Sequence, residues 1–127
     1  MTTTAISGET FMQTIEGDGI VLVDFWAALC GPCRQFGPIF EAASVKHPDI
    51  TFTKVDTEAE QHLAGALGIT SIPTLMAFRD GILLFSQPGA LPASALEQVI
   101  ETVRKADMDD VRAKVAEQEQ QTEQRPA

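Results

Sequence analysis

Positive charge is scarce in this chain of 127 residues, which has 9 Lys and Arg residues against 18 Asp and Glu residues and a formal net charge of -9. The longest basic cluster is the pair Arg104-Lys105. Affinity for nucleic acid depends mainly on Lys and Arg side chains that contact phosphates. The charge balance therefore argues against a nucleic-acid-binding protein and against one that attaches to anionic membranes.

Long hydrophobic runs are also missing. The longest apolar stretch, Ile20 to Cys30, has 11 residues and contains Asp24, whereas a membrane-spanning helix needs about 20 apolar residues. We interpret this stretch as a core segment. Residues 1–7 have neither the basic start nor the hydrophobic run of a secretory signal, and we expect the protein to be cytoplasmic.

Cysteine occurs only at Cys30 and Cys33. Cytosolic thiols are kept reduced, so a permanent disulfide is unexpected there, and a redox or metal-binding role is favoured instead. At this chain length, folding removes roughly two thirds of the unfolded chain's surface from water. A hydrophobic core can therefore form without disulfides or metal.

The apolar spacing alternates between strand-like and helix-like segments up to residue 106, without an internal repeat or a linker. This alternation predicts one α/β layer structure. The predicted helices lie near 7–16, 32–47, 58–67 and 92–106, and the predicted strands at 20–26, 50–56, 74–78 and 82–85. The first strand lacks a polar face, which indicates a central strand covered on both sides. Asp80-Gly81 predicts an antiparallel hairpin between the last two strands.

Residues 107–127 differ in composition from the rest of the chain. They contain six acidic and three basic residues, a Gln/Glu-rich run at 117–121 and no aromatic residue, so they can bury little surface. A weak apolar stripe of Met108, Val111 and Val115 would suit a helical extension, but we favour a solvated or frayed tail. We therefore predict a domain over 1–106 and an acidic C-terminal tail over 107–127 that is a helical extension or disordered.

Cys30-Gly31-Pro32-Cys33 lies where the buried strand is followed by a helix. Cys30 is then at the helix N-terminus, where unpaired N–H groups and the macrodipole favour a thiolate. A thiolate attacks one sulfur of a disulfide to form a mixed disulfide, which a second thiol can resolve. We expect Cys30 to be exposed and to attack, and Cys33 to resolve, because Cys33 is followed by the packed stripe that begins at Phe36.

Two other interpretations of the cysteine pair stay open. A CxxC motif is also half of a zinc site, but structural zinc needs four ligands, and only His47 and His62 remain, at no finger-like spacing. The pair could also be two inert buried thiols. We expect no bound metal. We expect both histidines to be structural or solvated, and Arg34 to be an exposed charge that is screened by solvent.

The run Val23 to Cys33, VDFWAALCGPC, resembles the active-site signature of thioredoxins, and the resemblance continues in register to about residue 106. Its other parts are Lys54-Val55-Asp56, Ser71-Ile72-Pro73-Thr74-Leu75, Asp80-Gly81 and Gly89-Ala90-Leu91. The resemblance implies a thioredoxin fold, in which a central mixed β-sheet is flanked by α-helices. It also implies a monomeric protein-disulfide reductase without a bound cofactor, whose reducing power comes from NADPH through a thioredoxin reductase.

Asp24 is an ionisable residue in an otherwise apolar strand, and loss of hydration raises the pKa of a carboxyl group. The resemblance implies that Asp24 helps to deprotonate Cys33. The alternative is a structural pairing with Lys54, and the two roles are compatible.

The resemblance also implies a substrate-binding surface. Proline in this position of thioredoxins follows a cis peptide bond, although only about 5% of such bonds are cis in general. We therefore expect Ile72 and Pro73 to contact the substrate, and Gly89 to allow its close approach. The same surface is expected to include Trp26, Leu29, Gly31 and Pro32.

Leu29 departs from the thioredoxin pattern, which usually has tryptophan immediately before the first cysteine. Leucine keeps an apolar contact but lacks the broad ring and its N–H donor. We expect this change to affect docking of partners, including thioredoxin reductase. It also supports a second hypothesis, a partner-binding module with weak turnover in which the altered face and the acidic tail recruit a client protein.

Overall fold

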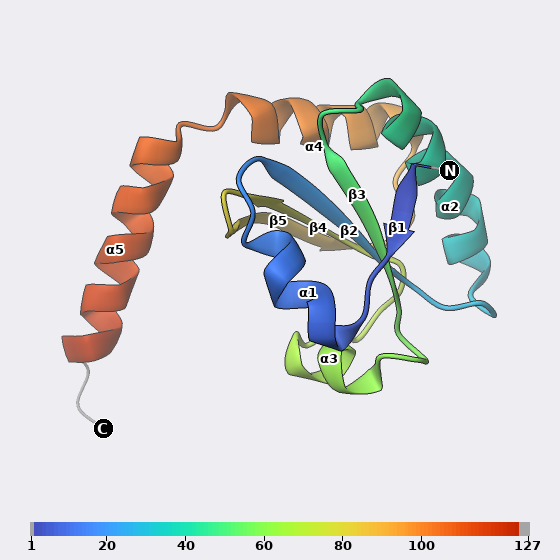
Figure 1. Ribbon diagram of the computed structural model, residues 1–127, viewed down its shortest axis with the longest axis horizontal. Coiled ribbons are helices and arrows are strands. Elements are labelled where there is room, and N and C mark those ends of the chain that lie inside the picture. The colour runs from blue at the N-terminus through green and yellow to red at the C-terminus, as the bar shows by residue number, and fades with distance from the viewer. Residues whose placement is uncertain (1, 125–127) are drawn as a thin grey trace.

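The computed structural model describes residues 2–124 (Figure 1). Its strands are β1 (Thr3–Ala5), β2 (Ile20–Trp26), β3 (Thr51–Asp56), β4 (Thr74–Arg79) and β5 (Ile82–Pro88). Its helices are α1 (Gly8–Ile15), α2 (Gly31–Lys46), α3 (Gln61–Ala66), α4 (Ala93–Lys105) and α5 (Met108–Gln124). The strands form one sheet in the order β1-β3-β2-β4-β5.

The sheet is mixed. Strands β1, β3 and β2 are parallel, because α2 returns the chain from the end of β2 to the start of β3. Strands β4 and β5 run antiparallel to their neighbours and are joined by the turn at Asp80-Gly81. The predicted α/β architecture with a central mixed sheet flanked by helices is therefore confirmed.

Strand β1 was not predicted. Its three residues have no apolar spacing, and the strand exists because it pairs with β3 at the edge of the sheet.

Helix α3 is shorter than the predicted 58–67. Asp56 Oδ1 accepts the N–H groups of Glu58 and Ala59 at 2.9 and 3.3 Å, which holds this segment in a turn before the helix begins.

Strand β2 is the centre of the hydrophobic core. On one face its Leu22 packs with Phe36 and Phe40 of α2 and with Ile100 of α4. On the other face a second cluster contains Phe11, Ile15, Val21, Val23, Phe25, Val55, Met76 and Phe78. Helices cover both faces (Figure 1), as the apolar sequence of this strand predicts.

The C-terminal segment forms a helix of its own. The chain leaves the helical conformation at Ala106, and Asp107 Oδ1 then accepts the N–H groups of Asp109 and Asp110 at 3.1 and 3.2 Å, which starts α5. Met108 is buried, Val111 and Val115 are half-buried, and the other α5 side chains up to Thr122 are exposed. Residues 125–127 of the predicted tail lie outside the described residues. No helix within residues 2–124 is long and apolar enough to cross a membrane.

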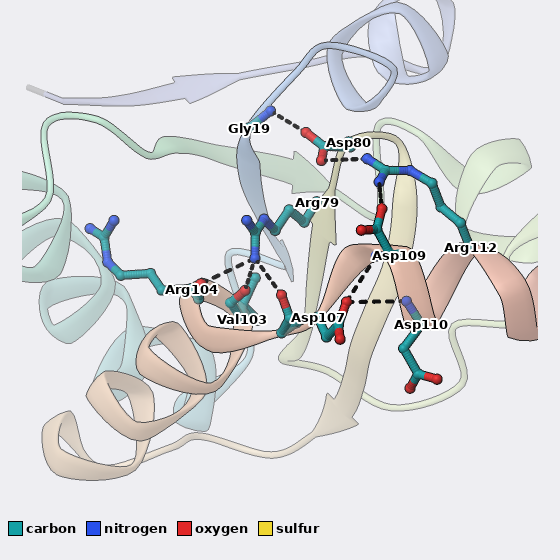
Figure 2. A network of polar contacts seen from close by, with 10 residues as sticks. Gly19, Arg79, Asp80, Val103, Arg104, Asp107, Asp109, Asp110 and Arg112 are labelled. Carbon is teal, nitrogen blue, oxygen red and sulfur yellow. Dashed lines mark hydrogen bonds and ion pairs between the residues drawn. The ribbon is translucent and has the colours of Figure 1, made fainter.

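Arg79 joins the sheet to the C-terminus of α4. Its Nη1 atom donates to the carbonyl oxygens of Val103, Arg104 and Ala106 at 3.0, 3.1 and 3.0 Å (Figure 2). The last carbonyl groups of a helix have no partner within the helix. The guanidinium group supplies these hydrogen bonds and also complements the negative end of the helix dipole.

We expect Arg79→Met to lower the free energy of unfolding by about 2 kcal/mol, because a charge-assisted hydrogen-bond set is lost and partly buried carbonyl groups are left unpaired. Urea denaturation followed by circular dichroism measures this change. Lys105→Met is the matched control, since it removes only an exposed ion pair with Glu101, which contributes little to stability. Equal losses in the two variants would contradict the role of Arg79.

Candidate active site

Cys30 and Cys33 are joined by a disulfide at the start of α2, with their Cα atoms 5.2 Å apart. Cys30 is the N-cap of the helix and has an extended backbone, and Gly31 and Pro32 form the first turn. The backbone N–H of Cys33 donates to Cys30 Sγ at 3.2 Å. This donor can equally stabilise a thiolate at Cys30 in the reduced protein, in addition to the helix dipole.

The two sulfur atoms differ in accessibility. Cys33 is only 5% exposed, whereas Cys30 is partly exposed. Cys33 faces the core because α2 buries the side of the helix that continues with Phe36 and Phe40. A disulfide substrate can therefore reach Cys30 but not Cys33.

A loop from the opposite side of the sheet reaches Cys30. The carbonyl oxygen of Ile72 lies 3.6 Å from Cys30 Sγ, and the Ile72–Pro73 peptide bond is cis, as the resemblance implied. Pro73 is buried, and its carbonyl oxygen accepts the N–H of Gly89 at 2.7 Å. Residues far apart in the sequence thus meet beside the exposed sulfur.

Position 89 requires glycine because of its backbone conformation, and not because a side chain there would clash with its surroundings. Its φ angle is +104°, a conformation that side-chain-bearing residues rarely adopt, and a Cβ placed there would meet no atom within 4 Å. The space beside Gly89 is therefore open to an approaching chain.

Leu29 is 83% exposed, the most exposed of the large hydrophobic residues in the described part of the chain. Gly31 and Pro32 are also exposed, and Trp26 is half-buried. The structure therefore places Leu29 next to Cys30 as an apolar side chain with little contact to the rest of the protein.

Asp24 is buried in the middle of β2 and only 1% exposed, and neither of its carboxylate oxygens has a hydrogen-bond partner. Burial raises the pKa of Asp24 from its ordinary value of 3.8 to about 7, although the positive charge of Lys54 acts in the opposite direction. Asp24 therefore changes its protonation state near neutral pH.

Lys54 lies opposite Asp24 on the neighbouring strand β3. No ion pair joins the two side chains among those found within residues 2–124, and Lys54 Nζ lies instead 4.9 Å from the centre of the Trp26 ring. The influence of Lys54 on Asp24 is electrostatic and does not satisfy the hydrogen-bonding capacity of the carboxylate.

A cavity of about 390 Å³ opens beside the buried sulfur and is lined by residues that include Trp26, Cys33, Arg34 and Lys54. Arg34 Nε also donates to the carbonyl oxygen of Ala28 at 3.1 Å, which connects α2 to the loop before Cys30. The sequence predicts an exposed Arg34 but not this contact, since a side chain bonded to a backbone carbonyl leaves no sequence pattern.

The two histidines lie away from the cysteines. His47 caps the C-terminus of α2, where its Nε2 atom is 2.8 Å from Glu97 and its Nδ1 atom is 3.0 Å from Arg104 of α4. His62 is exposed on α3. Within the described range 2–124, no three His, Cys, Asp or Glu side chains gather as a potential metal site.

Comparison with known proteins gives one consistent result. The family model described as Thioredoxin matches residues 2–102. The putative thioredoxin 2 of Streptomyces coelicolor is 55% identical over 119 residues, covering 94% of this chain and 89% of the relative. The thioredoxin of Alicyclobacillus acidocaldarius is 40% identical over 96 residues, covering 75% of this chain and 91% of the relative.

A solved structure agrees. The crystal structure of Malassezia sympodialis thioredoxin superimposes with a TM-score of 0.72 at 34% identity, covering 80% of this chain and 93% of the other. The CxxC cysteines and their disulfide supply the redox centre of a thiol–disulfide reductase, which needs no bound cofactor. The chain therefore belongs to the thioredoxin family of thiol–disulfide oxidoreductases.

Proposed function

We propose that Cys30 is the attacking sulfur of this reductase and that Cys33 is the resolving one. The observation that carries this assignment is the difference in accessibility across the disulfide, with Cys33 only 5% exposed. The Cys30 thiolate bonds to one substrate sulfur and releases the other as a thiolate. Cys33, as a thiolate, then attacks Cys30 Sγ and releases the second substrate sulfur. The substrate gains two electrons and the chain ends as the Cys30–Cys33 disulfide.

Asp24 takes the proton of Cys33 in this proposal. Resolution needs Cys33 as a thiolate, and a buried thiol has few groups that can accept its proton. A carboxyl group with a pKa of about 7 is ionised to a substantial degree at neutral pH and can receive and release a proton there. Lys54 supports Asp24 by moderating the rise of its pKa.

The substrate chain lies against the loop beside Cys30. The backbone of Ile72 pairs with it, Pro73 holds the loop next to the sulfur, and the open space at Gly89 admits it. The exposed Leu29 provides an apolar contact. Trp26, Gly31 and Pro32 complete the same surface.

Thioredoxin-family proteins act on disulfide-containing proteins and are reduced by reductases. For this chain we propose a thioredoxin reductase that uses NADPH as the specific electron source. We also propose a cytoplasmic location, which suits a reducing dithiol because thiols are kept reduced there. A monomer suffices, since one chain contains both cysteines. In this proposal residues 1–106 are the redox domain, and 107–127 are an addition to it.

Insulin reduction tests the proposal in two assays, one driven by dithiothreitol and one by NADPH with a cognate reductase. Turnover in both assays is expected. The high exposure of Leu29 also supports the second hypothesis, a partner-binding module. The same two assays distinguish it from a reductase. Absence of turnover in both assays would favour that module over a reductase.

Leu29→Trp is expected to raise kcat/KM with the reductase by about threefold to tenfold and to change the dithiothreitol-driven rate by a smaller factor. A larger aromatic surface with an N–H donor strengthens docking, whereas the sulfur chemistry is the same. Steady-state kinetics at several concentrations of this protein and a fixed reductase concentration measure this change. Met12→Trp on α1, which is also an exposed apolar position, is the control. An equal gain in both variants would contradict a docking role for Leu29.

A further inference from the structure

The end of the sheet opposite the CxxC has its own polar network, which fixes the position of α5. Strand β4 runs antiparallel to β2, so Arg79 lies beside Ile20 at the start of β2, whereas Cys30 follows its end. Asp80 accepts the N–H of Gly19 at 2.8 Å through Oδ1 and pairs with Arg112 of α5 at 3.2 Å through Oδ2 (Figure 2). Together with Arg79 at the end of α4, this network connects the first turns of α5 to the sheet.

Helices α4 and α5 meet at a corner (Figure 1). A groove of about 560 Å³ is lined there by residues of β5, α4 and α5. Its apolar lining comes from Leu84, Phe85, Leu91, Val99, Val103 and Val111. Leu84 and Phe85 are neighbours in sequence, yet both pack on the α4 side, because the β4–β5 register shifts at this point. The groove is thus built by a strand irregularity, two helices and the ion pair that orients α5.

Farther along α5, Val115, Gln118, Glu119 and Thr122 border a separate, shallow depression. With Val111, these residues follow the spacing of one helix face. We call the groove and this face of α5 the α4–α5 strip. It is apolar where α5 begins and polar, with one carboxylate, toward the end of the described helix.

The shape of the strip favours a helix as its occupant. Strand β5 is at the edge of the sheet, but its register shift and Pro88 interrupt the row of backbone groups that an added strand would need. A corner between two helices and a sheet instead accepts the apolar face of an amphipathic helix.

The charges on α5 favour a basic occupant. Arg112 and Lys114 pair with Asp80, Asp109 and Asp110, whereas none of the ion pairs found within residues 2–124 involves Glu117 or Glu119. The whole chain has a net charge of -9. Complementary charge steers association and selects partners.

We propose that the α4–α5 strip binds an amphipathic helix of a partner protein, one that presents aliphatic side chains to the groove and Lys or Arg toward Glu119. The α5 part of the strip lies at the opposite end of the sheet from Cys30, whereas the groove extends along β5 and α4 as far as Gln87 and Leu91, near Gly89. The family match ends at residue 102, before α5, so the α5 part of the strip lies outside the matched range and most of the groove lies within it.

The test uses the full-length oxidised protein labelled with ¹⁵N and a synthetic amphipathic peptide made of leucine and lysine. The expected result is a set of amide shifts concentrated at Leu84, Val99, Val111 and Val115. A peptide with glutamate in place of lysine should bind at least about tenfold more weakly, equivalent to about 1.4 kcal/mol. Equal binding of the two peptides, or shifts spread over the whole acidic surface, would overturn the proposal.

Two variants localise the binding. Val111→Asp places a charge in the groove, and Glu119→Lys reverses the charge at an exposed position, where folding is expected to be unaffected. Each should weaken binding of the lysine peptide about tenfold. Glu9→Lys on α1, at an exposed position outside the strip, changes the net charge by the same amount as Glu119→Lys and is the matched control. Loss of binding in Glu9→Lys equal to that in Glu119→Lys would show that only net charge matters and would refute the site.

Discussion

Cys33→Ser is expected to convert the protein into one that captures a disulfide substrate once and retains it. The partly exposed Cys30 still forms a mixed disulfide, but the hydroxyl group of serine cannot attack Cys30 Sγ to release it. Turnover of insulin should fall by at least about a thousandfold, equivalent to about 4 kcal/mol in the barrier. Intact-mass spectrometry under non-reducing conditions should find a covalent complex at one substrate chain per protein.

Cys30→Ser is the matched control for this experiment. Its remaining thiol, Cys33, is 5% exposed and packed against the core, so no covalent complex is expected within the same time. A complex formed as fast by Cys30→Ser as by Cys33→Ser would mean that the attacking and resolving roles are reversed. Dithiothreitol should release the substrate from the Cys33→Ser complex, which separates a disulfide from other adducts.

Asp24→Asn is expected to stabilise the protein at alkaline pH. The pKa of Asp24 is raised from 3.8 to about 7 by burial, so the folded state binds a proton more tightly than the unfolded state. Stability must then fall as the pH rises from about 4 to about 7 and stay low above that range. A difference of this size between the two pKa values corresponds to about 4 kcal/mol at most.

The asparagine variant does not ionise and should lose this pH dependence. Urea denaturation between pH 4 and pH 9 should give similar stabilities for the two proteins at the acidic end and a more stable variant above pH 7. The gain will be less than the maximum, because the buried amide also lacks hydrogen-bond partners. Asp18→Asn, at an exposed carboxyl group, should leave the pH profile unchanged. If the free energy of unfolding of Asp24→Asn changed with pH in parallel to that of the natural protein, the raised pKa of Asp24 would be contradicted.

The same variant also separates the two chemical steps. Asp24→Asn should slow the resolution by Cys33 more than the attack by Cys30, because only resolution uses the proposed proton transfer. Stopped-flow measurements of mixed-disulfide formation and decay distinguish the steps. Equal slowing of both would refute the proton role and leave Asp24 with a purely electrostatic effect.

Most of the sheet could be predicted from the sequence because its signals are local. The unbroken apolar run of β2 and the Asp80-Gly81 turn specify a buried strand and a hairpin within a few residues. Strand β1 has no such signal, since its three exposed or half-exposed residues become a strand only by pairing with β3. The separate helix α5 was also difficult to predict, because its anchor Arg112 binds a residue in a distant turn.

The cysteine pair could be found from spacing, whereas the surroundings that make it reactive could not. Cys30 and Cys33 are three residues apart, and any helix that starts between them brings their sulfur atoms together. The Ile72 carbonyl oxygen and Gly89 reach the site from other parts of the chain. Only the family resemblance connected them with Cys30, since nothing in their spacing does.

The sequence by itself determined the layer architecture, the position of the CxxC at a helix N-terminus and the place of a carboxyl group in the central strand. These properties depend on residue type and short-range spacing. The tertiary structure decided how strongly the two sulfur atoms differ in exposure, how far the pKa of Asp24 rises, and that α4 and α5 enclose a groove. Exposure, desolvation and grooves arise from contacts between distant segments, and such contacts exist only once the chain has folded.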